Sequence, residues 1–231
     1  MSRFHDRRVP GESAFYRTRR DELLEAERAL RGQIEAVAAL RRALPPGGLV
    51  EEDVCFEDAG RPGSPAPRET KMPLAGLFLP GRDSLVIYGW MFAPGGPPCP
   101  SCTSILDGLD GAAPHIEQRT ALVAVGKAPA AELRRFATER GWRHLRLLSS
   151  GGSGFNRAYG SETASGAQMP MLMVFRRSPE GIRHHWSSEL LHAPAEPGQE
   201  PRHVDLVWPL WHVLDLVPQG RGDFSPRLSY D

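Results

Sequence analysis

Two apolar strands on either side of a cysteine pair restrict the fold of this 231-residue chain more than any other feature. Residues 84–90 (SLVIYGW) and 121–126 (ALVAVG) are nearly continuous apolar runs, typical of strands that are covered on both faces. Between them, the Cys99-Pro-Ser-Cys102 motif opens a segment, 103–119, with apolar residues at helical spacing. A strand–helix–strand order predicts two parallel strands joined by a right-handed crossover.

Further strands and helices follow from the same periodicities. We expect a short strand over 50–57, a helix over 129–140, strands over 142–148, 171–175 and 182–186, and a closing helix over 204–216. Gly141 predicts the end of the second helix, and Pro209 would have to lie in the first turn of the last one. The chain is therefore predicted to be an α/β protein with a central mixed sheet flanked by helices.

The N-terminal segment is predicted to be one long helix, over residues 13–44. Leu23, Leu30, Val37 and Leu44 recur at heptad spacing, and Pro and Gly residues follow directly. This helix either lies on its own domain or pairs with a second copy as a homodimer. We expect two parts, an N-terminal helical arm over 1–48 and a domain over 49–231 that ends in a C-terminal helical extension.

Charge and cysteine content exclude several classes of protein. Lys plus Arg and Asp plus Glu number 28 each, which gives no electrostatic footprint for nucleic acid or a membrane surface. The N-terminus has no signal-peptide pattern, and no stretch reaches the roughly 20 apolar residues of a membrane span. Three cysteines do not make a secreted disulfide framework. We expect a cytoplasmic protein with neither nucleic acid nor membrane as a partner.

The cysteine pair carries the strongest chemical signal. Unpaired N–H groups and the positive end of the dipole at a helix N-terminus stabilise a thiolate, so Cys99 is the expected nucleophile. Cys102, one turn later, can attack a mixed disulfide and release the substrate, which would be a thiol or disulfide of a protein or small molecule. Two alternatives stay open, half of a metal site and an inert pair. We expect no cofactor and no metal, and Cys55 to be a small buried hydrophobe.

Several stretches of the chain resemble a large bacterial family of thioredoxin-like proteins that are labelled predicted dithiol–disulfide oxidoreductases. The matching stretches are PGESAFYRTRRDELLEAE, LVIYGWMF, CPSCTSILDGLDGAAPHI, KAPAAELRRFATERGWRHLRLLSS and RHVDLVWPLWHVLDL. This resemblance implies a thioredoxin-like fold, with Cys99 and Cys102 as the redox pair. It also implies that Pro170 is a cis-proline facing the cysteines and that it positions the substrate together with the Met169 backbone.

Two departures from thioredoxins keep other functions open. Pro98 stands where thioredoxins have Trp, and the insertion MFAPGGPP separates the strand from the motif. The insertion resembles the loop before the peroxidatic cysteine of peroxiredoxins, although the expected Thr is absent. A thiol peroxidase, with Arg146 or Arg157 activating the peroxide, is therefore one rival. A metal-binding or haem-binding protein and a non-catalytic interaction module are the others.

Overall fold

A computed structural model describes residues 4–50, 54–68, 70–199 and 202–230. The chain divides into two compact units, Met1–Pro45 and Pro46–Asp231. The predicted division after residue 48 stays a prediction.

The first unit is built around the long helix that the sequence predicts. Helix α1 (Ala14–Arg42) begins after Ser13, whose hydroxyl accepts a hydrogen bond of 3.1 Å from the backbone N–H of Tyr16. Arg41 and Arg42 lie in the last turn, where cations interact favourably with the helix dipole. No residue of α1 is buried, and the Leu30 side chain is 60% exposed. The apolar stripe therefore has no covering partner within its own unit.

The second unit contains one mixed sheet. Its strands are β1 (Cys55–Gly60), β2 (Lys71–Pro73), β3 (Ser84–Gly89), β4 (Ala121–Gly126), β5 (Arg146–Ser149), β6 (Leu172–Ser178) and β7 (Gly181–Ser187), in the order β2-β1-β5-β4-β3-β6-β7. The central strands β5, β4 and β3 are parallel, as the crossover argument predicts. Strands β1, β6 and β7 each run antiparallel to their neighbours.

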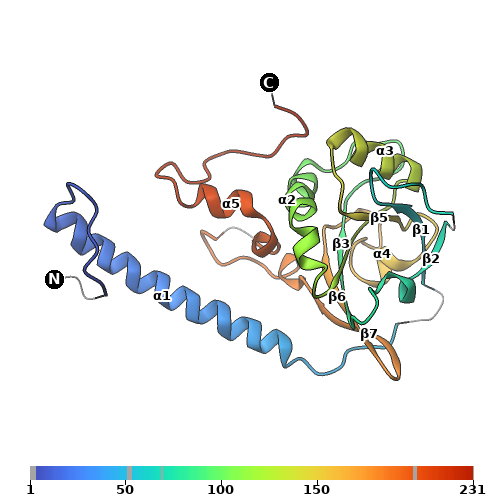
Figure 1. The fold of residues 1–231 in the computed structure, drawn as a ribbon, viewed down its shortest axis with the longest axis horizontal. Coiled ribbons are helices and arrows are strands. Elements are labelled where there is room, and N and C mark those ends of the chain that lie inside the picture. Colours follow the sequence, from blue (N-terminus) through green and yellow to red (C-terminus); the bar gives the residue numbers. More distant parts are fainter. Residues whose placement is uncertain (1–3, 51–53, 69, 200–201, 231) are drawn as a thin grey trace. The chain divides into compact units, whose positions relative to one another are not determined.

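Helices cover this sheet. They are η1 (Leu74–Leu77), α2 (Pro100–Ile116), α3 (Ala130–Arg140), α4 (Phe155–Ala158), η2 (Glu189–Leu191), η3 (Asp205–Val207) and α5 (Pro209–Leu214). Figure 1 shows α2 running beside the strands, and it connects β3 to β4. The β3-α2-β4-α3-β5 series followed by the antiparallel β6–β7 hairpin makes this a thioredoxin-like fold, so the predicted fold class is confirmed.

Two hydrophobic cores form because side chains alternate across the strands. On β3, Leu85 and Ile87 face one core, together with η1 and α4. Tyr88 faces the other core, which contains Cys102 and the buried sides of α2 and α3. The two thiols of the motif therefore belong to one face of the sheet only.

Three predicted elements differ from the structure. The strand expected over 142–148 begins only at Arg146, because the Asp110 carboxylate accepts the backbone N–H groups of the three preceding residues, Arg143, His144 and Leu145, and holds them out of the sheet. The strand expected over 50–57 begins at Cys55, and residues 51–53 lie outside the described part of the chain. The closing helix is broken at Trp208, since Pro209 can only open a new helix.

Candidate functional site

Cys99 is the N-cap residue of α2. Its backbone is extended rather than helical (ψ 123°), and its sulfur accepts the backbone N–H of Cys102 at 3.3 Å. Its own N–H donates to the Met91 carbonyl oxygen at 2.9 Å, which fixes the end of the inserted loop. Pro100 occupies the first helical turn, where a missing N–H costs nothing. The sulfur of Cys99 therefore lies where the free N–H groups of the helix start converge.

The two thiols have very different acidities. The hydrogen bond from Cys102 lowers the pKa of Cys99 to about 6, assisted by the backbone N–H groups of Cys102 and Ser101 and opposed by burial. The same hydrogen bond, burial and the charge on Cys99 raise the pKa of Cys102 far above its ordinary value. All three cysteines of the chain are free thiols. Near neutral pH the pair is therefore one thiolate, on half-buried Cys99, beside one buried thiol.

The C-terminal segment supports the helix that carries the thiols. The indole N–H of Trp208 donates to the Ser104 hydroxyl on α2 at 3.1 Å. Farther along α2, a Cβ on Gly108 would lie in ordinary van der Waals contact with Pro209 Cδ, at 3.4 Å, so the closing segment packs directly against the helix. Residues more than 100 positions apart thereby fix the orientation of α2.

Gln168 links the predicted substrate-positioning segment to the loop before Cys99. The Phe92 N–H donates to the Gln168 side-chain oxygen at 3.1 Å, and Phe92 follows Met91, the partner of Cys99. Met169 donates its N–H to the Ser161 carbonyl oxygen at 2.9 Å. Residues 168–170 therefore lie beside the loop that leads into the thiol site.

The predicted cis-proline is wrong. Among the residues that the structure describes, no peptide bond is cis, so the Met169–Pro170 bond is trans. Residues 162–168 turn back on themselves through the bridge between Glu162 and Gln168, and the chain enters β6 in extended form. Burial is the main cause of the lowered pKa of the His203 imidazole, and the Pro170 backbone is among the groups that oppose this shift.

A family model described as "Bacterial protein of unknown function (DUF899)" matches residues 6–229. This chain belongs to that family. The family expected from the sequence motifs is confirmed at this level, and the match extends over both units of the structure.

No curated protein matches the sequence of this DUF899 protein. Among solved structures, PrxQ of Xylella fastidiosa is 13% identical over 62% of this chain and 84% of its own, with a TM-score of 0.46. Peroxidoxin BcpB of Mycobacterium tuberculosis is 16% identical over 74% of this chain and 98% of its own, with a TM-score of 0.45. Thioredoxin peroxidase I of Plasmodium yoelii is 14% identical over 81% of this chain and 99% of its own, with a TM-score of 0.46.

The other residues considered from the sequence lie in ion pairs or elsewhere in the sheet. Arg146 pairs with buried Asp58 at 2.5 Å, and Arg157 pairs with Glu162 at 3.0 Å, so each guanidinium already has a carboxylate partner. Cys55 begins β1, where it is half-buried rather than buried. Within the described residues, no group of three or more His, Cys, Asp or Glu side chains could hold a metal ion, and no helix is long and apolar enough to cross a membrane.

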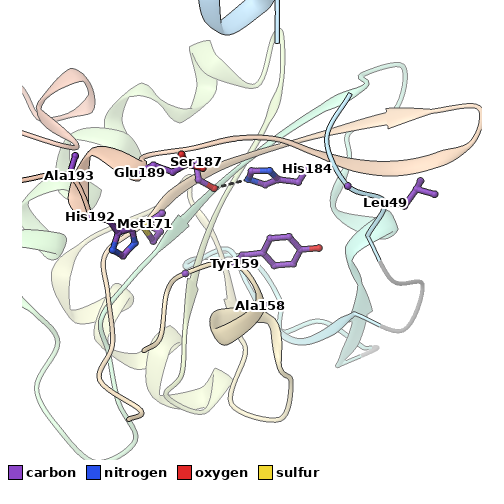
Figure 2. Close-up of a pocket in the computed structure, with 11 residues that line it drawn as sticks. Leu49, Ala158, Tyr159, Met171, His184, Ser187, Glu189, His192 and Ala193 are labelled. Carbon is purple, nitrogen blue, oxygen red and sulfur yellow. Dashed lines mark hydrogen bonds between the residues drawn. The ribbon is translucent and has the colours of Figure 1, made fainter. Parts of the chain in front are cut away.

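A separate cavity of about 740 Å³ lies beside β7 in this DUF899 protein. Figure 2 shows His184 hydrogen-bonded to Ser187 at its wall, with 2.7 Å between the His184 Nε2 and Ser187 Oγ atoms. The His184 ring stacks on Tyr159 with centroids 5.9 Å apart, and burial lowers its pKa. Tyr159 and Met171 pack in the core on the opposite face from Cys102, so this cavity is separated from the thiols by the sheet.

Tyr88 lies in the core beside the thiol site, and no motif in the sequence pointed to it. Its side chain is fully buried on β3 in the same core as Cys102, and interactions with both cysteines contribute to the raised pKa of its phenol. In an apolar run such as 84–90 a tyrosine reads as a core residue. No spacing rule relates Tyr88 to the cysteine motif, because an inserted loop of arbitrary length separates them.

Proposed function

We propose that this protein is a dithiol–disulfide oxidoreductase in which Cys99 is the attacking thiol and Cys102 the resolving thiol. The asymmetry of the pair carries this proposal. Cys99 has a pKa of about 6 and is half-buried, so at neutral pH it is the nucleophilic thiolate. Cys102 is buried and stays protonated until Cys99 has reacted.

The reaction has two exchange steps. The Cys99 thiolate attacks one sulfur of a substrate disulfide, a Cys99–substrate disulfide forms, and the other substrate sulfur leaves as a thiolate. Cys102 then loses its proton and attacks the Cys99 sulfur, which releases the second substrate thiolate. The substrate is reduced to two thiols, and the protein dithiol is oxidised to the Cys99–Cys102 disulfide. With the opposite redox poise the same steps run in reverse.

The segment 168–170 is the proposed site of substrate positioning. The N–H of Met169 is already bonded to Ser161. The backbone oxygen of Met169 is therefore the group that we expect to accept a hydrogen bond from an extended peptide or thiol substrate. Pro170 fixes the chain direction behind it. The proposed partners are disulfides or thiols of proteins or small molecules in a reducing compartment.

The reduction potential of the pair tests this function. The protein is equilibrated in glutathione buffers of graded poise, alkylated and analysed by mass, with Cys99→Ser and Cys102→Ser as controls. We expect a reversible two-electron couple between roughly −300 and −120 mV that is lost in both variants. Absence of the disulfide at every poise would remove the basis of the proposal. Fast peroxide consumption with sulfenic acid at Cys99 would favour a peroxidase instead, and bound metal that blocks alkylation would favour a binding protein.

A further inference from the structure

Tyr88 carries a buried hydroxyl that has no hydrogen-bond partner among the residues that the structure describes. Its side chain is 0% exposed, and its hydroxyl makes no hydrogen bond of good geometry with any described residue. The neighbours of Tyr88 in the sheet are Ala124 and Leu172, whose side chains cannot bond to a hydroxyl. An unpaired buried hydroxyl destabilises a fold, and phenylalanine would fill the same space without this cost. The hydroxyl therefore does not stabilise the fold, and we look for its role in the chemistry of the site.

Tyr88 and Cys102 lie in the same buried core, and Cys99 packs against that core. Cys102, buried in the same core, and Cys99 both contribute to the raised pKa of Tyr88, after burial itself. Tyr88 keeps its proton at neutral pH, so it can act as a hydrogen-bond donor and not as a base. Tyr88 in turn lowers the pKa of Cys102, as does the backbone of Met91.

We propose that the Tyr88 hydroxyl donates a hydrogen bond to the Cys102 sulfur when Cys102 becomes a thiolate, and that it thereby speeds the resolving step. This inference rests on the proposed function. Tyr88 then acts as a positioning residue for the Cys102 sulfur in the resolving step, and it has no role when Cys99 attacks the substrate disulfide.

The state of the pair after the first step explains why such a donor matters. Once Cys99 is bonded to substrate sulfur, its hydrogen bond and its negative charge no longer hold the proton on Cys102. Burial still opposes the Cys102 thiolate, and the Met91 backbone and Tyr88 are the two groups that favour it. The proton of Cys102 leaves to solvent, its electron pair forms the new bond to the Cys99 sulfur, and the substrate leaves as a thiolate.

A chromogenic disulfide separates the two steps. The full chain with Cys55→Ser is mixed with 5,5′-dithiobis(2-nitrobenzoate), and released thionitrobenzoate is followed by stopped flow. Attack by Cys99 releases the first thionitrobenzoate, and resolution by Cys102 releases the second. Tyr88→Phe removes only the hydroxyl, and Tyr159→Phe is the matched control, since that tyrosine packs in the other core.

We expect Tyr88→Phe to leave the first phase unchanged, and to slow the second by about tenfold with its pH midpoint moved upward. Tyr159→Phe should change neither phase. An unchanged second phase in Tyr88→Phe, or equal slowing of both phases, would overturn the role of Tyr88. If the parent protein itself shows no second phase, the proposed dithiol function fails instead, so the two failures are distinguishable.

Discussion

The backbone N–H of Cys102 lies 3.3 Å from the Cys99 sulfur, so the turn of helix that carries the second cysteine stabilises the thiolate of the first. The Cys102 side chain also donates to that sulfur, and this hydrogen bond is the largest cause of the lowered pKa of Cys99. The side chain and the backbone of Cys102 thus both stabilise the Cys99 thiolate. Substitution of the Cys102 side chain separates their two contributions to the pKa of Cys99.

Cys102→Ala should raise the pKa of Cys99 from about 6 toward its ordinary value, because the side-chain donor is lost while the backbone donors remain. Cys102→Ser keeps a hydroxyl donor and should raise it less. The measurement is the pH dependence of Cys99 alkylation by iodoacetamide. Equal pKa values in the two variants and the parent would show that the Cys102 side chain does not stabilise the thiolate.

The stability of the reduced protein should depend on pH through Cys99. Its folded pKa lies below its unfolded pKa, so the stabilisation is present above the unfolded value and is lost as pH falls through about 6. We expect the free energy of unfolding to rise by about 1–2 kcal/mol between pH 6 and 8.5. This rise is smaller than the whole pKa shift would give, because Cys99 is partly exposed and solvent screens its interactions. Urea titrations of the parent and of Cys99→Ser at both pH values measure this free energy. A rise of the same size in both proteins would show that other groups cause the pH dependence.

Asp110→Asn should destabilise the protein by about 2–4 kcal/mol. The buried Asp110 carboxylate accepts three consecutive backbone N–H groups, from Arg143 to Leu145 at 2.8 to 3.1 Å, and an amide would set its own N–H group against them. Asp107→Asn, one turn earlier on α2 and in an exposed ion pair with Arg140, should cost no more than about 1 kcal/mol. Chemical denaturation compares the two, and equal costs would contradict the assigned role of Asp110.

Gly47→Ala and Gly48→Ala should differ sharply although the residues are adjacent. A Cβ on Gly47 would overlap the His184 carbonyl oxygen, whereas a Cβ on Gly48 meets nothing within 4 Å. The first substitution should cost about 2–3 kcal/mol or detach this segment from β7, and the second should be nearly neutral. Hydrogen exchange of the His184 N–H, which donates to the Gly48 carbonyl oxygen at 3.0 Å, reports the detachment. Similar stabilities in both variants would argue against this close approach.

Homodimerisation through α1 remains a proposal based on the heptad positions and on the absence of buried residues along this helix. Leu30→Glu should convert a dimer to a monomer by light scattering coupled to size exclusion. Ala39→Glu introduces the same charge on the opposite side of the helix and should leave the dimer intact. A parent protein that is monomeric at tens of micromolar would rule out this role for α1.

The sequence by itself determined the elements whose cause is local. Helix α1, strands β3 and β4, and the cysteine pair at the start of α2 follow from periodicity and turn residues within a few positions of each other. Strand β4 lies over 121–126, as its apolar run predicts. The parallel pairing of β3, β4 and β5 follows from these elements together with the handedness of crossovers, whereas the thioredoxin-like fold was implied by the resemblance to a known family.

Only the tertiary structure decided the features that depend on distant residues. Asp110 shortens β5 through a contact across 33 positions, and the peptide bond before Pro170 is trans. Tyr88 and Cys102 lie in the same core although an inserted loop, whose length no periodicity encodes, separates them in the sequence. Local rules fix which residues become strand or helix, whereas hydrogen bonds and buried groups from remote segments fix where each element ends and which side chains meet at the thiols.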